Sequence, residues 1–171
     1  EALCDPMCGS GTFLIEAAQM VLDVAPGLGR HFAFERFKQY ERDTWLPIRQ
    51  AAEARRQAPR PLAIFGSDIV EGQVRKSFVN LRSAGLEGCV TLERADMLER
   101  RAPAPAGVLV ANPPYGVRLS DTAELEALYP KLGDALKANW SGWRAYFFTG
   151  DPQLPKGVRL KASKRTPLFN G

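Results

Sequence analysis

Short apolar runs alternate with helically spaced apolar residues along most of the chain. The first run, residues 1–4, is followed by a glycine-rich turn and by helical spacing up to Leu22, and Pro26-Gly27 ends that helix. From residue 61 the alternation is regular, because each apolar run precedes a polar turn and a helical stretch. The pattern predicts strands near residues 1–4, 62–66, 90–92, 108–111 and 145–148, and helices near residues 13–22, 44–58, 74–84 and 123–137.

Strands that alternate with helices predict an α/β, Rossmann-like fold. Crossovers of this length place helices over both faces of a mostly parallel sheet. The last segment, Val158 to Phe169, is instead predicted to form an antiparallel hairpin around Ala162-Ser163-Lys164. A length of 171 residues with 45% hydrophobic residues suits one continuous core, so we expect residues 1–171 to form a single domain. Because the chain begins at a strand end, we also expect it to be a fragment.

Composition argues against a secreted, membrane or zinc protein. No apolar stretch approaches the about 20 residues of a membrane-spanning helix, and the first residues lack the features of a secretion signal. We therefore expect a cytoplasmic protein with reduced thiols and no membrane partner. The cysteines, Cys4, Cys8 and Cys89, form no CxxC pair, and His31 is the only histidine. Because the usual zinc-ligand spacing is missing, we expect no obligatory metal.

The positive net charge favours a phosphate-rich partner, but the charge alone does not establish nucleic-acid binding. The net charge is +4, and Lys and Arg give sequence-independent affinity for nucleic acid. The segment from Phe32 to Arg60 interleaves aromatic and basic residues, which suits an RNA-facing surface, because aromatics stack on unpaired bases while arginines hold phosphates. A helical pair whose aromatics pack on the core is an alternative interpretation of the same segment.

Three predicted strand ends carry residues that suit a nucleoside-containing cofactor. In doubly wound sheets, ligands bind beyond the carboxyl ends of the strands. Asp5 precedes the turn Gly9-Ser10-Gly11-Thr12, whose glycines let the main chain approach a ligand. Asp68 can accept bonds from ribose hydroxyls, and Asp96 can accept from an adenine amino group while Met97 lies against the ring. Singly, these residues also fit a tight turn, a helix cap and a surface loop, but together they favour the cofactor.

The fourth strand end, Asn112-Pro113-Pro114-Tyr115-Gly116, indicates what the cofactor does. Two prolines hold a stiff extended turn directly after a buried strand. If the Asn112 side-chain oxygen and the Pro113 carbonyl accept the two hydrogens of a base amino group, its nitrogen faces a methyl sulfonium and the developing charge is stabilised. Tyr115 can stack on the base. The alternative is that this segment is only a turn in a loop and binds no base.

Together, the stretches DPMCGSGT (residues 5–12) and NPPYG (residues 112–116) resemble the catalytic domain of the RlmL type of bacterial 23S rRNA guanine-N2 methyltransferases, relatives of the THUMP-containing RNA methyltransferases. The resemblance runs nearly end to end, and its further matches are residues 25–28, 30, 66–68, 132–133, 136–137, 142–143 and 170–171. It implies a class I methyltransferase fold with S-adenosylmethionine as cofactor and RNA, 23S rRNA above all, as partner. The family's THUMP region and the helix before the first strand are not in this chain.

The resemblance also assigns roles to individual residues. It implies that Asp5, Gly9 and Gly11 approach the methionine part of S-adenosylmethionine, that Asp68 holds the ribose and that Asp96 holds the adenine. It further implies that Asn112, Pro113 and Tyr115 hold the target guanine.

Three alternatives stay open at this point. The Asn-Pro-Pro-Tyr element is shared with adenine-N6 DNA methyltransferases and with protein-glutamine methyltransferases. A non-catalytic fragment that binds cofactor or RNA is the third.

Overall fold

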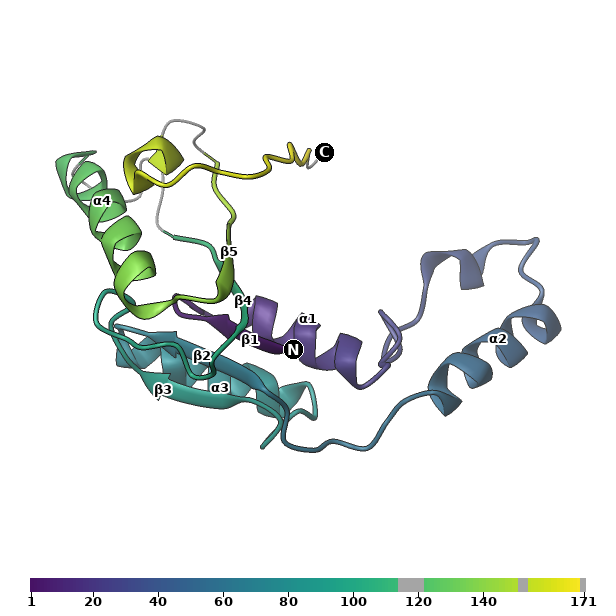
Figure 1. The fold of residues 1–171 in the computed structure, drawn as a ribbon. Helices are drawn as coiled ribbons and strands as arrows, with labels where there is room; N and C mark the ends of the chain where they lie inside the picture. Colours follow the sequence, from purple (N-terminus) through teal and green to yellow (C-terminus); the bar gives the residue numbers. More distant parts are fainter. Residues whose placement is uncertain (114–121, 151–153, 170–171) are drawn as a thin grey trace.

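The computed structural model describes residues 1–113, 122–150 and 154–169, and within them five parallel strands form one sheet (Figure 1). Their order is β3-β2-β1-β4-β5, so β1 lies in the middle and pairs with β2 on one side and β4 on the other. This confirms the mostly parallel, Rossmann-like sheet. The strands are β1 (Ala2–Asp5), β2 (Ile64–Asp68), β3 (Thr91–Arg94), β4 (Gly107–Ala111) and β5 (Trp143–Phe147).

Among the described residues, the four α-helices lie where helices were predicted, but their ends differ by a few residues. The α-helices are α1 (Thr12–Val21), α2 (Arg42–Ala54), α3 (Glu71–Ser83) and α4 (Thr122–Asn139), and two short 3-10 helices are η1 (Ala33–Arg36) and η2 (Leu154–Val158). Apolar spacing locates the buried part of a helix, whereas its ends depend on local turn geometry. No helix in the described part of the chain is long and apolar enough to cross a membrane.

Each face of the sheet carries its own buried core. Leu14 and Ala18 of α1 and Leu81 of α3 pack on one face with Ile64. Gly66 of β2 has to be glycine there, because a Cβ at this position would collide with the Leu14 side chain. On the other face, α4 packs on β1 and β4 through a second set of buried residues, which includes Cys4, Leu109, Ala111, Tyr129, Leu132 and Leu136. Helices therefore cover both faces, as predicted.

The predicted C-terminal hairpin is wrong for the described residues. The 3-10 helix η2 ends at Val158, and residues 159–169 contain no strand. Only the η2 end is anchored, since Gly133 of α4 lets the Val158 carbonyl approach and the Val158 side chain is buried. Beyond it, Leu168 and Phe169 are 71% and 92% exposed. A single hairpin that buries no apolar face has little to stabilise it.

Residues 30–60 form an arm that extends away from the sheet (Figure 1). The arm contains η1 and α2, and α2 has no buried residue. Its aromatic side chains pack on one another and belong to neither core of the sheet. The interpretation in which these aromatics pack on the main core is therefore wrong.

Candidate functional site

The four strand ends singled out in the sequence lie at one edge of the sheet. Because β1, β2, β3 and β4 are parallel, their carboxyl ends share that edge. The chain runs from β1 outward to β2 and β3, and then returns to place β4 on the other side of β1. The strand order therefore reverses next to β1, which is the position where open α/β sheets bind ligands.

A tight glycine turn connects β1 to α1. The Gly11 amide donates a 2.7 Å hydrogen bond to the Cys8 carbonyl, and Gly9 and Gly11 have positive φ angles of 53° and 83°. A Cβ added at Gly9 would meet no atom within 4 Å, so that side of the turn is open. No side chain caps the start of α1, which leaves amides of its first turn available to a ligand.

Asp5 lies beneath this turn and is only 2% exposed. The Met7 amide donates a 3.1 Å hydrogen bond to its Oδ1. Burial raises the pKa of the Asp5 carboxyl from its ordinary value of 3.8 to about 7, the Met7 amide lowers it, and the nearby Asp68 charge raises it further. Asp5 is thus an interior group that shapes the turn, with a pKa close to neutral pH.

Asp68 joins the end of β2 to the glycine turn. Its Oδ2 accepts a 3.1 Å hydrogen bond from the Gly9 amide, and its Oδ1 accepts a 2.9 Å bond from the Val70 amide. The carboxylate does not cap α3, whose N-cap is Val70 without a side-chain cap bond. Since each carboxylate oxygen has two acceptor sites, Asp68 retains capacity for hydroxyl donors.

Ser77 of α3 holds the glycine turn from below, and sequence reasoning missed it. Its Oγ is fully buried and donates a 2.8 Å hydrogen bond to the Gly9 carbonyl. The Cys8 Sγ lies 3.5 Å from the same Oγ and donates to it, because the hydroxyl hydrogen is already used. The signal was available, since Ser77 is a polar residue three positions after Val74 and four before Leu81, on the apolar stripe of α3.

Asp96 follows β3 in a turn that it stabilises itself. Its Oδ1 accepts a 2.8 Å hydrogen bond from the Leu98 amide. The neighbouring Met97 is 2% exposed and packs in the core under α4. The expectation that the Met97 side chain lies against a cofactor ring is therefore wrong.

A second buried polar contact ties the ends of β2 and β3 together. Arg100 is 8% exposed, makes a 2.8 Å ion pair with Glu93 and donates a short hydrogen bond to Ser67. An arginine in a loop gives no pattern in the sequence that distinguishes it from a surface charge, so this contact was not predicted.

At the end of β4, Asn112 is exposed and Pro113 is buried. The strand end is fixed by the Phe148 amide, which donates a 2.9 Å hydrogen bond to the Ala111 carbonyl. The end of β4 is thus held in place by this hydrogen bond and by the buried Pro113, while the Asn112 side chain is exposed to solvent. Tyr115 lies outside the described residues.

The described part of the chain contains no group of three or more His, Cys, Asp or Glu that could hold a metal ion. The three cysteines are buried and unpaired. Burial raises the pKa of the Cys8 thiol to about 11 and that of Cys4 to about 12, so both are protonated at neutral pH. Neither thiol is poised as a nucleophile.

A central β1, an open glycine turn and acids at the ends of β2 and β3 define the Rossmann-like class I methyltransferase fold. The whole chain, residues 1–171, matches the family described as UPF0020, RMKL-like, methyltransferase domain, and the protein belongs to that family.

Named relatives and solved structures agree with this assignment. The chain is 42% identical to the ribosomal RNA large subunit methyltransferase K/L of Cellvibrio japonicus over 99% of its length, and 40% identical to that of Syntrophotalea carbinolica. It spans about a quarter of the length of these relatives. The crystal structure of SMU.472 complexed with SAH superposes with a TM-score of 0.88 at 33% identity, covering 100% of this chain and 45% of that one. A predicted N6-adenine-specific DNA methylase from Listeria monocytogenes superposes with a TM-score of 0.83 at 33% identity, covering 99% of this chain and 44% of that one.

Proposed function

We propose that this chain is the catalytic domain of an S-adenosylmethionine-dependent methyltransferase that acts on the exocyclic N2 of guanine in RNA, with 23S rRNA as the substrate. The observation that carries the proposal is the hydrogen bond between the Gly9 amide and Asp68. This bond joins Asp68, our candidate for the ribose acceptor, to the open glycine turn after β1, the strand that neighbours β4. The relatives named as rRNA large subunit methyltransferases support RNA as the substrate.

The residues at the carboxyl edge fit S-adenosylmethionine. The open space beside Gly9 accommodates a ligand against the main chain, and the uncapped start of α1 offers amide donors. Asp68 has acceptor capacity left for the ribose hydroxyls, and Asp96 lies at the next strand end for the adenine amino group. The cofactor, when bound, supplies a methyl group on a sulfonium. The SAH complex of SMU.472 supports this choice of cofactor.

The chain's own contribution to the chemistry lies at the end of β4. The lone pair of a base amino group is delocalised into the ring, so the nitrogen is a weak nucleophile. The Asn112 side-chain oxygen and the Pro113 carbonyl accept its two hydrogens, orient the nitrogen and stabilise the positive charge that develops as the new bond forms. Tyr115 stacks on the base and keeps it in this orientation.

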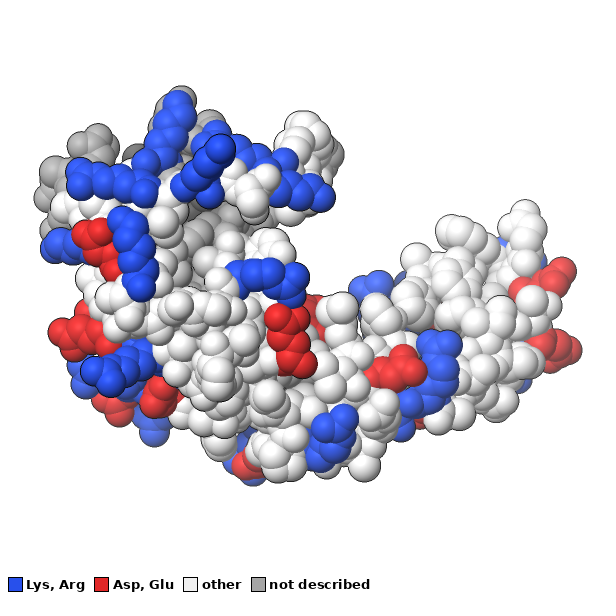
Figure 2. Space-filling model, in the orientation of Figure 1, with Lys and Arg blue, Asp and Glu red and all other residues white. Residues whose placement is uncertain are grey.

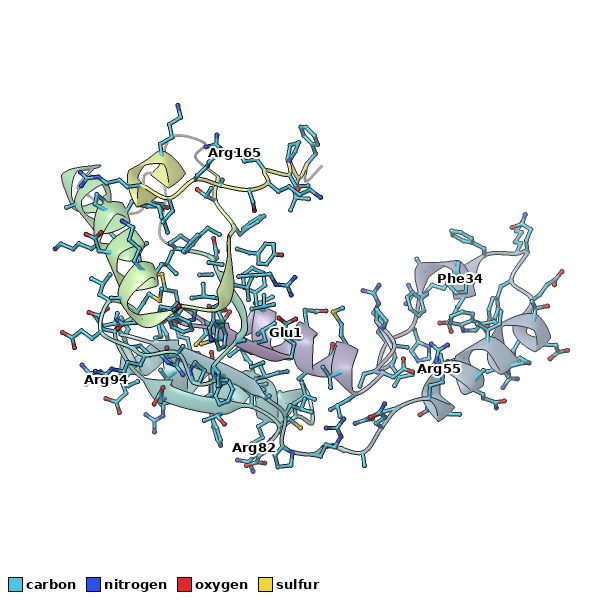
Figure 3. All side chains as sticks on the ribbon, viewed as in Figure 1. Glu1, Phe34, Arg55, Arg82, Arg94 and Arg165 are labelled. Carbon is cyan, nitrogen blue, oxygen red and sulfur yellow. The ribbon has the colours of Figure 1, made fainter. Side chains whose placement is uncertain are left out.

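A strongly basic C-terminal segment supports a nucleic-acid substrate. Residues 154–169 contain five Lys and Arg and no Asp or Glu. Beyond η2, which packs against α4, the described side chains of this segment are exposed. Figure 2 shows Lys and Arg gathered over this end of the molecule, and Arg165 is labelled there in Figure 3. Such cations give phosphate-dependent affinity that falls with salt.

Adenine-N6 methylation of DNA is the second candidate, because the Listeria structure of similar fold is described as an adenine-specific DNA methylase. The same acceptors at Asn112 and Pro113 suit either amino group. Methylation of a protein glutamine uses the same acceptors and is the third substrate class to be tested.

The experiment compares three substrates under one set of conditions. The chain is incubated with radiolabelled S-adenosylmethionine and 23S rRNA lacking its natural methylations, duplex DNA or a release-factor protein, and labelled products are digested and identified. We expect N2-methylguanosine from RNA and no label in DNA or protein. N6-methyladenine from DNA with unlabelled RNA would overturn the substrate assignment. Failure to bind S-adenosylhomocysteine in calorimetry would overturn the cofactor assignment separately.

A further inference from the structure

The arm, residues 30–60, is a separate structural unit, and polar contacts at its base join it to the end of α1 and to the loop after it. In one of them the Arg49 guanidinium donates a 3.3 Å hydrogen bond to the Leu28 carbonyl. The Gln57 amide donates a 2.8 Å hydrogen bond to the Leu22 carbonyl, and Arg55 forms a 3.6 Å ion pair with Asp23. Figure 1 shows the arm reaching outward beyond the C-terminal end of α1, and Figure 3 labels Phe34 and Arg55 on it. None of the described arm residues is buried in either core of the sheet.

An inner aromatic cluster gives the arm a defined shape. The Trp45 ring meets Phe32 and Phe34 edge-on, with centroid distances of 5.6 and 4.9 Å. Phe32 and Phe34 stack with centroids 5.5 Å apart, and the Arg30 guanidinium lies 4.9 Å from the centroid of the Phe32 ring. Edge-on and stacked pairs of this kind stabilise beyond the area they bury. The arm can therefore present a fixed surface without support from the main core.

Next to this cluster, the arm carries an open apolar groove of about 300 Å³. Phe37 and Ile48 line it and are 64% and 56% exposed. Phe34, also in its wall, is 37% exposed. Exposed rings that gather in one groove mark an interaction site more often than single exposed rings do. Its remaining walls are Gln39, Tyr40, Glu41, Thr44 and Trp45.

The arm also carries a net positive charge that equals that of the whole chain. It has eight Lys and Arg against four Asp and Glu, which leaves fifteen of each sign in the rest of the chain. Arg36, Lys38 and Arg42 are exposed and form no ion pair with another described residue. Two of these free cations, Arg36 and Lys38, directly flank Phe37 in the chain.

We propose that the groove of the arm binds an unpaired segment of RNA, with a base stacked on Phe37 and the adjoining phosphates held by Arg36 and Lys38. Every base has an aromatic face, so a stacking surface bordered by cations recognises single strands with little dependence on sequence. A protein partner would suit the apolar groove but not the unpaired cations beside it. The inference rests on the proposed RNA substrate and adds a second binding surface, remote from the carboxyl edge, that captures the same molecule.

The test measures binding of the 171-residue chain to a fluorescein-labelled single-stranded RNA of about 12 nucleotides by anisotropy, at several salt concentrations. Phe37→Ala removes the stacking ring, and its control, Phe78→Ala, removes a half-exposed ring from α3. A double variant, Arg36→Gln with Lys38→Gln, removes two exposed cations of the arm. Its control is a second double variant, Arg75→Gln with Lys76→Gln, which removes two exposed cations of α3. Circular dichroism melting confirms that each variant is folded.

Phe37→Ala is expected to weaken RNA binding roughly 5- to 150-fold, the loss typical of one stacked base. Arg36→Gln with Lys38→Gln is expected to weaken binding and to reduce the slope of log affinity against log salt by about 1.4, or about 0.7 for each phosphate that is no longer neutralised. Both α3 controls are expected to bind RNA within about twofold of the wild type. Equal losses in the arm and α3 variants, or unchanged RNA binding in folded arm variants, would overturn the proposal.

Two further measurements separate this proposal from the proposed function. In methylation assays, the arm variants are expected to raise the KM for RNA and to leave kcat and the affinity for S-adenosylhomocysteine unchanged. If the wild type binds S-adenosylhomocysteine but methylates only DNA, the proposed RNA substrate is wrong. The role of the arm is then still decided by the RNA-binding measurements. If the arm variants change sedimentation and not RNA binding, the groove holds a second copy of the chain and the RNA proposal is wrong.

Discussion

The Gly9 amide donates a 3.1 Å hydrogen bond to Oδ2 of Asp68, which joins the turn after β1 to the acid that ends β2. Two parts of the candidate cofactor site are thereby mechanically connected. The Gly9 carbonyl is held at the same time by Ser77 of α3, at 2.8 Å. Removing the Asp68 carboxylate should therefore have two effects. It removes the proposed acceptor for the ribose hydroxyls, and it removes a hydrogen bond that holds the glycine turn.

Asp68→Ala is predicted to weaken binding of S-adenosylhomocysteine while the domain stays folded. Each charge-assisted bond to a ribose hydroxyl is worth about 1.5–3 kcal/mol, so losing two of them lowers affinity by at least about a hundredfold. Calorimetry measures the affinity, and circular dichroism measures the fold. Asp68→Asn is the matched control, because it retains one acceptor oxygen and should lose less. Unchanged affinity in folded Asp68→Ala would remove this residue from the site.

Alanine at Gly9 and alanine at Gly11 are predicted to have different consequences. Both glycines have positive φ, so either substitution costs about 1–2 kcal/mol of stability. At Gly11 the new Cβ would also lie 2.9 Å from the Ser77 Oγ, which adds a clash. At Gly9 it would project into open space, where we place the cofactor.

Urea unfolding should therefore show Gly11→Ala as the less stable variant. Calorimetry should show that Gly9→Ala, although the more stable of the two, binds S-adenosylhomocysteine more weakly than the wild type. Normal affinity in Gly9→Ala would mean that the open side of the turn does not face the cofactor.

Asp5 is predicted to make the stability of the fold depend on pH. Burial raises its folded-state pKa to about 7, above the ordinary 3.8 that applies when the chain is unfolded. The unfolded chain therefore releases this proton first, and the contribution of Asp5 to stability falls as pH rises from about 3.8 to about 7, then stays constant. Urea unfolding of the wild type and of Asp5→Asn across this range isolates the effect. Parallel stability curves for the two proteins would contradict the raised pKa.

The strands and the residues that follow them could be predicted because they depend on local patterns, whereas the order of the strands in the sheet was not predicted. A buried strand such as residues 108–111 is short and continuously apolar, and the polar residue that ends it is next in the sequence. Once the strands are known to be parallel, their ends must share an edge. The sequence therefore predicted that Asp5, Asp68 and Asp96 lie at that edge, although their roles toward a ligand remain a proposal.

The hydrogen bonds that hold the site could not be predicted, because they join residues far apart in the chain. Ser77 reaches Gly9 across 68 residues, and Arg100 reaches Ser67 across 33. Met97 was misjudged for a related reason: apolar character alone does not say whether a side chain after a strand turns to the ligand or to the core, and here it is 2% exposed under α4.

The most direct test of the central claim concerns Asn112 at the end of β4. Its side-chain oxygen is predicted to accept a hydrogen from the target amino group, so Asn112→Ala should lower turnover of RNA roughly 10²–10³-fold at saturating cofactor. Tyr115→Ala should weaken RNA engagement by about 1–3 kcal/mol, whereas Tyr115→Phe keeps the ring and should be mild.

The decisive measurement is the rate of N2-methylguanosine formation by Asn112→Ala, with S-adenosylhomocysteine affinity determined in the same preparation. The proposed mechanism predicts a large loss of rate and an unchanged affinity. Lost S-adenosylhomocysteine binding together with normal RNA methylation at saturating cofactor would place Asn112 in the cofactor pocket and contradict the proposed mechanism.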